Sequence, residues 1–272
     1  MLQRLLLAFL LAAALGSCGG GGGDGGSSPP PKLPVAAQAA NLTTANAPNF
    51  ANAVDVAARM AATMRLGQFL SGILTPGTLT DVGCGAMGSS PATVVVTPFS
   101  PPTTTSVTGT ATFSNFDHCF GMRLSGAASL SGTMVGTQVI SFNFTLTNLS
   151  FTAGAQVFQL AGSASLQFVT LPSGGAKYVM TLDGTVSGAG SFQLSGFRVE
   201  STLSAGLEDL LISGRLTMAD GFVDIAPTAS PVELFVPSSG LQNGSVTMTG
   251  ATTIATAFFN GATAPTITIA PR

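Results

Sequence analysis

The most reactive side chains of this chain are three cysteines, Cys18, Cys84 and Cys119, and the single histidine, His118. His118 directly precedes Cys119, and these are residue types that both zinc sites and cysteine nucleophiles use. A zinc site would need further ligands from elsewhere in the chain, so a loop histidine beside an oxidised cysteine is the simpler interpretation. We therefore assign neither a metal nor a catalytic role to this pair.

Acidic side chains cluster twice, at Glu208-Asp209 and at the pair Asp220 and Asp224. The second pair could join a loose calcium site, but its spacing differs from that of an EF-hand loop, and a solvated turn is the simpler interpretation. The chain has no GxxxxGK[ST] loop and no GxSxG elbow. We expect a protein that is not an enzyme and that carries no metal or other cofactor.

The composition is poor in charge. Charged residues are 7% of the 272 residues, and the net charge is −2, whereas an average soluble protein has roughly 25% charged residues. Without a basic run the chain cannot neutralise a row of phosphates, so the sequence argues against nucleic-acid binding. Neutral polar residues must cover the surface, which fits a protein that works outside the cytoplasm.

The first 17 residues are typical of a cleaved export signal, because one arginine, Arg4, precedes a short apolar segment over residues 5–15. Residues 15–18, Leu15-Gly16-Ser17-Cys18, resemble the lipobox of bacterial lipoproteins. The resemblance implies that Cys18 is the first residue of the mature chain and carries a diacylglycerol and an acyl chain such as palmitate. Gly19, rather than aspartate, follows the cysteine, which by the sorting rule of that family implies the outer membrane. The alternative is an ordinary signal peptide that is cut nearby.

If Cys18 carries lipid, an even pair of cysteines remains. Export places Cys84 and Cys119 in an oxidising compartment, where disulfides persist, so we expect a bond between them. Two separate buried thiols are the alternative.

Three segments follow from the composition: a lipoprotein signal over residues 1–17, a lipidated flexible tether over 18–47, and a single β-rich domain over 48–272. The tether is rich in Gly, Ser and Pro, which cannot form a core. Within the domain, apolar residues at steps of three and four predict one helix over 49–71, with Asn49 as its cap. The residues of this apolar stripe are Phe50, Val54, Ala57, Met60, Ala61 and Met64, and it could extend to Leu70.

Two-residue alternation dominates the chain from Val107 onward, and residues 140–147 show it almost without interruption. This pattern predicts antiparallel strands with one buried and one solvated face. Glycines recur inside these segments, and glycine within a strand marks a bulge or a sharp bend. We expect an all-β fold, a curved meander sheet or a half-barrel or barrel, with the helix packed on it.

These features predict a non-enzymatic lipoprotein of the cell envelope, held in the outer membrane through lipid on Cys18, on either its periplasmic or its surface-facing side. It would present a structural or binding domain to a protein or glycan partner. The alternative is a carrier that holds a lipid or acyl chain in an apolar cavity between the curved sheet and the helix. The chain also loosely resembles the β-rich lipoproteins of Gram-negative bacteria that have no assigned function.

Overall fold

We describe the protein from a computed structural model, in which the described residues are 38–64, 77–81, 92–98, 106–117, 121–135, 138–170, 176–204, 207–235, 240–261 and 264–272. They form one α-helix, α1 (Ala47–Thr63), and a single sheet of 14 strands. The strands are β1 (Gly77–Asp81), β2 (Ala92–Pro98), β3 (Ser106–Asp117), β4 (Arg123–Val135), β5 (Gln138–Ala153), β6 (Gln156–Thr170), β7 (Ala176–Gly188), β8 (Phe192–Ser204), β9 (Leu207–Met218), β10 (Gly221–Pro227), β11 (Val232–Phe235), β12 (Gly244–Thr249), β13 (Thr253–Phe259) and β14 (Thr266–Pro271).

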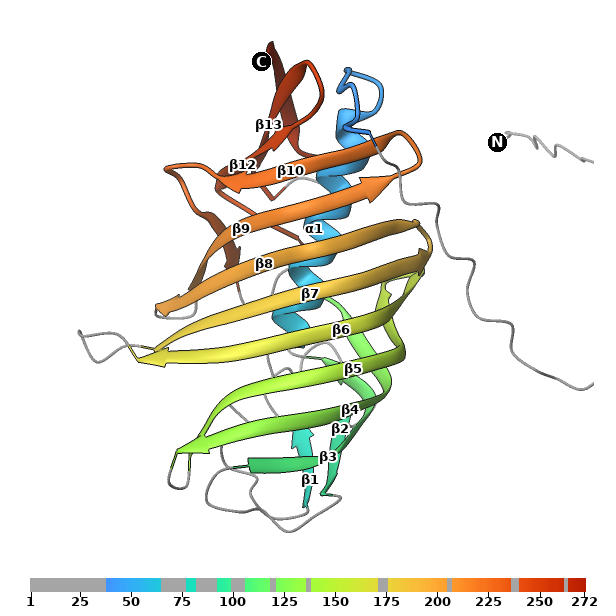
Figure 1. The fold of residues 1–272 in the computed structure, drawn as a ribbon, viewed down its shortest axis with the longest axis vertical. Helices are drawn as coiled ribbons and strands as arrows, with labels where there is room; N and C mark the ends of the chain where they lie inside the picture. Colours follow the sequence, from blue (N-terminus) through green and yellow to red (C-terminus); the bar gives the residue numbers. More distant parts are fainter. Residues whose placement is uncertain are drawn as a thin grey trace, which may run out of the picture. The chain divides into compact units, whose positions relative to one another are not determined.

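The sheet is an antiparallel meander (Figure 1). From β1 to β10 each strand pairs with the next one in sequence, and the order then continues through β12, β13 and β14. β11 lies off this path and pairs with the first residues of β9, while β10 pairs with its last residues. Because the order starts at β1 and ends at β14, the described strands form an open, curled sheet. The predicted all-β class, with one helix, is confirmed.

Two of the strand glycines lie where the strands shift register. Gly126 lies within the shift between Ser125 and Ala128 of β4, and Gly196 lies within a similar shift in β8. Gly162 of β6 and Gly184 of β7 face each other in register, and their backbones are so close that a Cβ on Gly162 would lie 2.6 Å from the Cα of Gly184. The predicted link between glycine and strand irregularity is therefore confirmed.

One hydrophobic core joins α1 to the inner face of the sheet, by which we mean the face that α1 contacts. In β5, Phe142, Phe144 and Leu146 are buried on this face, whereas the alternate residues Asn143 and Thr145 are exposed. The predicted apolar stripe of the helix is also buried, with every described member at most 2% exposed, while Leu70 lies outside the described residues. Alanines on α1 let the helix lie close to the strands, and the buried ones are Ala47, Ala51, Ala53, Ala57, Ala58, Ala61 and Ala62.

The helix begins earlier than predicted. It starts at Ala47 and follows Asn46, so Asn49 is inside the helix and is not its cap. Pro48 fits the first turn because proline has no backbone N–H to leave unpaired there. The described part of the helix ends at Thr63, and residues 65–71 of the predicted helix lie outside the described residues. α1 has 17 residues, and in the part of the chain that is described no helix has both the length and the hydropathy to cross a membrane.

The β domain also begins earlier than residue 48, its predicted start. Ala39 forms a parallel bridge with Phe222 of β10, and the N–H of Ala40 donates to the carbonyl of Phe222 at 2.8 Å. Ala40 and Leu42 are 0% and 2% exposed. This segment has few large apolar residues, so its composition did not predict that it belongs to the domain. Backbone hydrogen bonds attach it to the sheet. The rest of the predicted tether and the signal, residues 1–37, lie outside the described residues.

Candidate functional site

A cleft of about 370 Å³ lies between α1 and one side of the sheet, where strands end in turns. We call this side the sheet edge. In a meander, every second turn lies at the same edge, so the turns that follow β5, β7 and β9 come together there (Figure 1). The helix contributes residues at steps of three and four along one face, and the sheet contributes residues at or near these turns. The lining residues are Asn49, Asn52, Ala53, Asp55, Val56 and Arg59 from α1, and Gln156, Phe158, Ala189, Gly190, Phe192 and Met218 from the sheet edge.

An ion pair between Arg59 and Asp55 lies on the helix side of the cleft. Nη2 and Nε of Arg59 lie 2.7 and 2.9 Å from Oδ2 of Asp55. The other oxygen, Oδ1, accepts a hydrogen bond of 2.8 Å from the backbone N–H of Leu241. Asp55 therefore fixes the guanidinium and also joins the helix to the chain before β12. The two bonds between Arg59 and Asp55 use Nη2 and Nε of the guanidinium and do not use Nη1.

No role was assigned to Arg59 in the sequence analysis. Its residue exposure is only 8%. A signal was present in the sequence: Asp55 and Arg59 are four residues apart on a helix, with the acid first, which is the favourable order for an ion pair.

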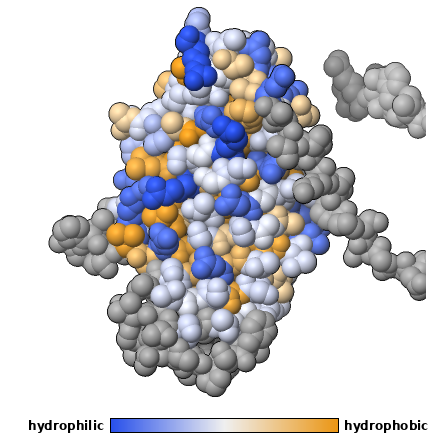
Figure 2. All heavy atoms as spheres, in the orientation of Figure 1, coloured by the Kyte–Doolittle hydropathy of each residue, from blue (hydrophilic) through white to orange (hydrophobic). Residues whose placement is uncertain are grey.

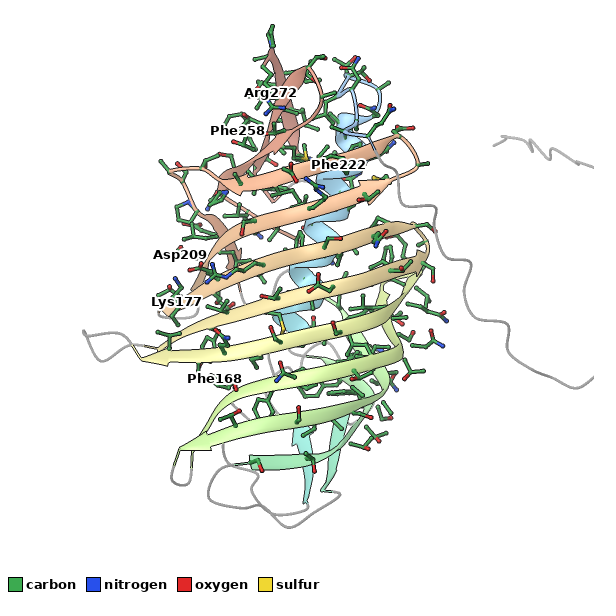
Figure 3. All side chains as sticks on the ribbon, viewed as in Figure 1. Phe168, Lys177, Asp209, Phe222, Phe258 and Arg272 are labelled. Carbon is green, nitrogen blue, oxygen red and sulfur yellow. The ribbon has the colours of Figure 1, made fainter. Side chains whose placement is uncertain are left out.

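The acidic pair Glu208-Asp209 does not form one site, since neighbouring residues of a strand point to opposite faces of the sheet. Glu208 is completely buried on the inner face, where its Oε2 accepts a hydrogen bond of 2.9 Å from Oγ of Ser201. Asp209 lies on the outer face, and Figure 3 places it near Lys177 at the left-hand ends of β9 and β7.

Replacing Glu208 with alanine is expected to lower the free energy of unfolding by about 2 kcal/mol, because Ser201 loses its acceptor and a void opens in the core. Urea unfolding would measure the change. Asp209→Ala is the matched control, and it should alter stability by less than about 0.5 kcal/mol because Asp209 is not in the core. Equal effects of the two substitutions would contradict the assigned positions.

The second acidic pair is also divided. Asp224 of β10 forms a two-bond ion pair with Arg215 of β9, with distances of 2.8 and 3.0 Å. The hydrogen bonds to Asp224 raise the pKa of Arg215, and its guanidinium carbon stacks 3.8 Å from the ring centre of Phe222. Asp220 lies in the turn before β10. Within the described residues, no three His, Cys, Asp or Glu side chains come together as metal ligands.

Charged and apolar side chains also lie side by side on the outer face, and Figure 2 shows hydrophilic side chains beside hydrophobic ones in the left half of the view. Glu200, whose side chain is 16% exposed, pairs with both Lys177 and Arg198. Leu211 and Val169 are 37% and 42% exposed nearby on β9 and β6. The carboxylate of Glu200 therefore binds two cations at once on this surface.

The predicted lipidation and disulfide residues, Cys18, Cys84 and Cys119, lie outside the described residues, as does His118. The disulfide stays a prediction. Peptide mapping without reduction should recover one cross-linked peptide that contains Cys84 and Cys119, because an exported pair with no competing thiol is oxidised. Free thiols at both positions in protein prepared from the cell envelope would contradict the pairing.

Comparisons with family models, with curated proteins and with solved structures found no match to this chain.

Proposed function

We propose that this chain is a lipid-anchored protein of the bacterial outer membrane whose β domain binds a glycan or protein partner and catalyses no reaction. The anchor follows from the lipobox resemblance at residues 15–18. Support for binding comes from the cleft beside α1, which has the volume of a small-ligand site and is lined by amide side chains, an ion pair and a few apolar groups.

The tight packing between α1 and strands β7 to β9 favours this proposal over the alternative of a lipid or acyl-chain carrier. A carrier needs an apolar pocket of at least about 300 Å³. Between α1 and strands β7 to β9, the described residues enclose a gap of only about 10 Å³. Its lining includes Ala61, Tyr178 and Glu208, so even this gap is partly polar. The larger cleft lies at the sheet edge and has polar side chains at its mouth, which does not suit an alkyl chain.

Native mass spectrometry of full-length Cys18→Ser protein, purified without detergent, tests the proposal. This variant removes the anchor and leaves the β domain unchanged. We expect the mass of the polypeptide alone. An added mass that matches a phospholipid or fatty acid, and that is lost on collisional activation, would contradict the proposal and support the carrier.

A further inference from the structure

We infer that the cleft between α1 and the sheet edge binds an uncharged glycan. This inference rests on the proposed function, since it names the ligand class of the same cleft. Three properties of the lining carry it: the amides at its mouth, the cancelled charge, and the apolar groups at its base.

The polar side chains at the mouth are amides. Asn49 and Asn52 lie one helical turn apart on α1, and Gln156 faces them from the start of β6. All three are exposed. An amide offers two donor hydrogens and one acceptor oxygen, so it can pair with a hydroxyl whichever way that hydroxyl is oriented. Sugars present several such hydroxyls close together. Amides on two sides of a cleft can form hydrogen bonds with neighbouring hydroxyls of one sugar.

The charge in the cleft selects against ionic ligands. Arg59 and Asp55 are the only charged residues in the lining, and they neutralise each other at 2.7 Å. A phosphate or carboxylate ligand would have to compete with Asp55 for the guanidinium, because Nε and Nη2 already bind that carboxylate. Nη1 stays available as a donor to a neutral oxygen. The ion pair therefore acts on a ligand as one more polar group and not as a net charge.

The base of the cleft is apolar. Phe158 and Phe192 are 4% and 2% exposed, and Val56 and Met218 are half-buried beside them. A sugar ring has C–H groups that need such a surface, while its hydroxyls need the amides above it. A volume of about 370 Å³ is near the lower end of the range for small-ligand sites, which suits one or two sugar rings.

Binding of the full-length protein, in mild detergent, to a printed array of neutral and anionic glycans tests the inference. Neutral oligosaccharides of hexoses and N-acetylhexosamines are expected to retain the protein. Titration calorimetry with the strongest of them then measures the variants. Asn52→Ala and Gln156→Ala should each weaken binding about fivefold, the effect of losing one hydrogen bond. Ala189→Trp should abolish binding, because Ala189 is an exposed residue of the rim and the indole would fill the cleft.

Gln159→Ala is the matched control. Gln159 is an exposed amide on the same strand as Gln156 but is not part of the lining, so its loss should leave affinity unchanged. Retention on anionic glycans only, or on none of the array, would overturn the inference. So would binding that survives Ala189→Trp. None of these results bears on whether the protein carries a lipid, which the mass spectrum of the Cys18→Ser protein tests separately.

Discussion

Gly162→Ala is expected to lower the free energy of unfolding by about 4 kcal/mol, a large share of the 5–15 kcal/mol that is typical of a domain. Two costs add. The φ of Gly162 is +148°, where an alanine is strained. A Cβ there would also overlap the carbonyl oxygen of Asp183 on β7 and lie 2.6 Å from the Cα of Gly184, so two paired backbones would have to separate.

Two other glycines separate these costs. Gly154, in the turn between β5 and β6, has a φ of +59° and nothing within 4 Å of a Cβ, so Gly154→Ala should cost about 1 kcal/mol from backbone strain alone. At Gly184, which is not among the positive-φ glycines, a Cβ would overlap the carbonyl oxygen of Ala161 on β6. Gly184→Ala should therefore cost about 2 kcal/mol from crowding alone.

Urea unfolding of the three variants, followed by circular dichroism, measures these differences. The expected ranking is Gly162→Ala as the most destabilised, then Gly184→Ala, then Gly154→Ala. If Gly162→Ala proved as stable as Gly154→Ala, the close approach of β6 and β7 would be wrong, and with it the explanation of why glycines recur in these strands.

The features that depend on a local period were predictable from the sequence. The inner-face residues of β5 and the buried stripe of α1 repeat every two and every three or four residues, and burial selects for that repeat. The glycines were interpretable for a similar reason. Gly162 interrupts a strand in which apolar and polar residues otherwise alternate. A glycine at such a position indicates a bend or a close approach of two backbones.

The cleft was not predictable in the same way. It joins Asn52 and Arg59 of the helix to Gln156 and Ala189, which lie about a hundred or more positions later in the chain. Each residue is unremarkable in its own segment, and only the curl of the sheet brings them together. The same holds for Ala40, whose burial depends on hydrogen bonds to Phe222 and Ala251. Contacts over such separations leave no trace in a short window of sequence.

The low charge of the chain connects these observations. Most of the described charged side chains on the outer face and in the cleft are paired with one another, as Arg215 is with Asp224 and Arg59 is with Asp55. Neutral hydroxyl and amide groups are then left to make the contacts with a partner. Such a surface is weakly sensitive to salt, because screening acts on charges and not on hydrogen bonds. Binding at the cleft should share that property.

Cys18→Ser is expected to move the protein from the membrane fraction to the soluble fraction of a Gram-negative host almost completely. Each buried CH₂ of an acyl chain contributes about 0.8 kcal/mol to membrane binding, and two or more chains give a stable anchor. Fractionation with immunoblotting measures the shift, and metabolic labelling with an alkyne fatty acid should mark the wild type and not the variant.

Ser17→Ala is the matched control, because it keeps a small residue beside the cleavage site and leaves the sulfur of Cys18 in place. It should remain in the membrane fraction and should still be labelled. The mass of the N-terminal peptide gives an independent reading, since an acylated cysteine at its first position identifies residue 18 as the mature start. A Cys18→Ser protein that stays in the membrane fraction, or a wild-type mature chain that begins elsewhere without acyl groups, would contradict both the anchor and the proposed location.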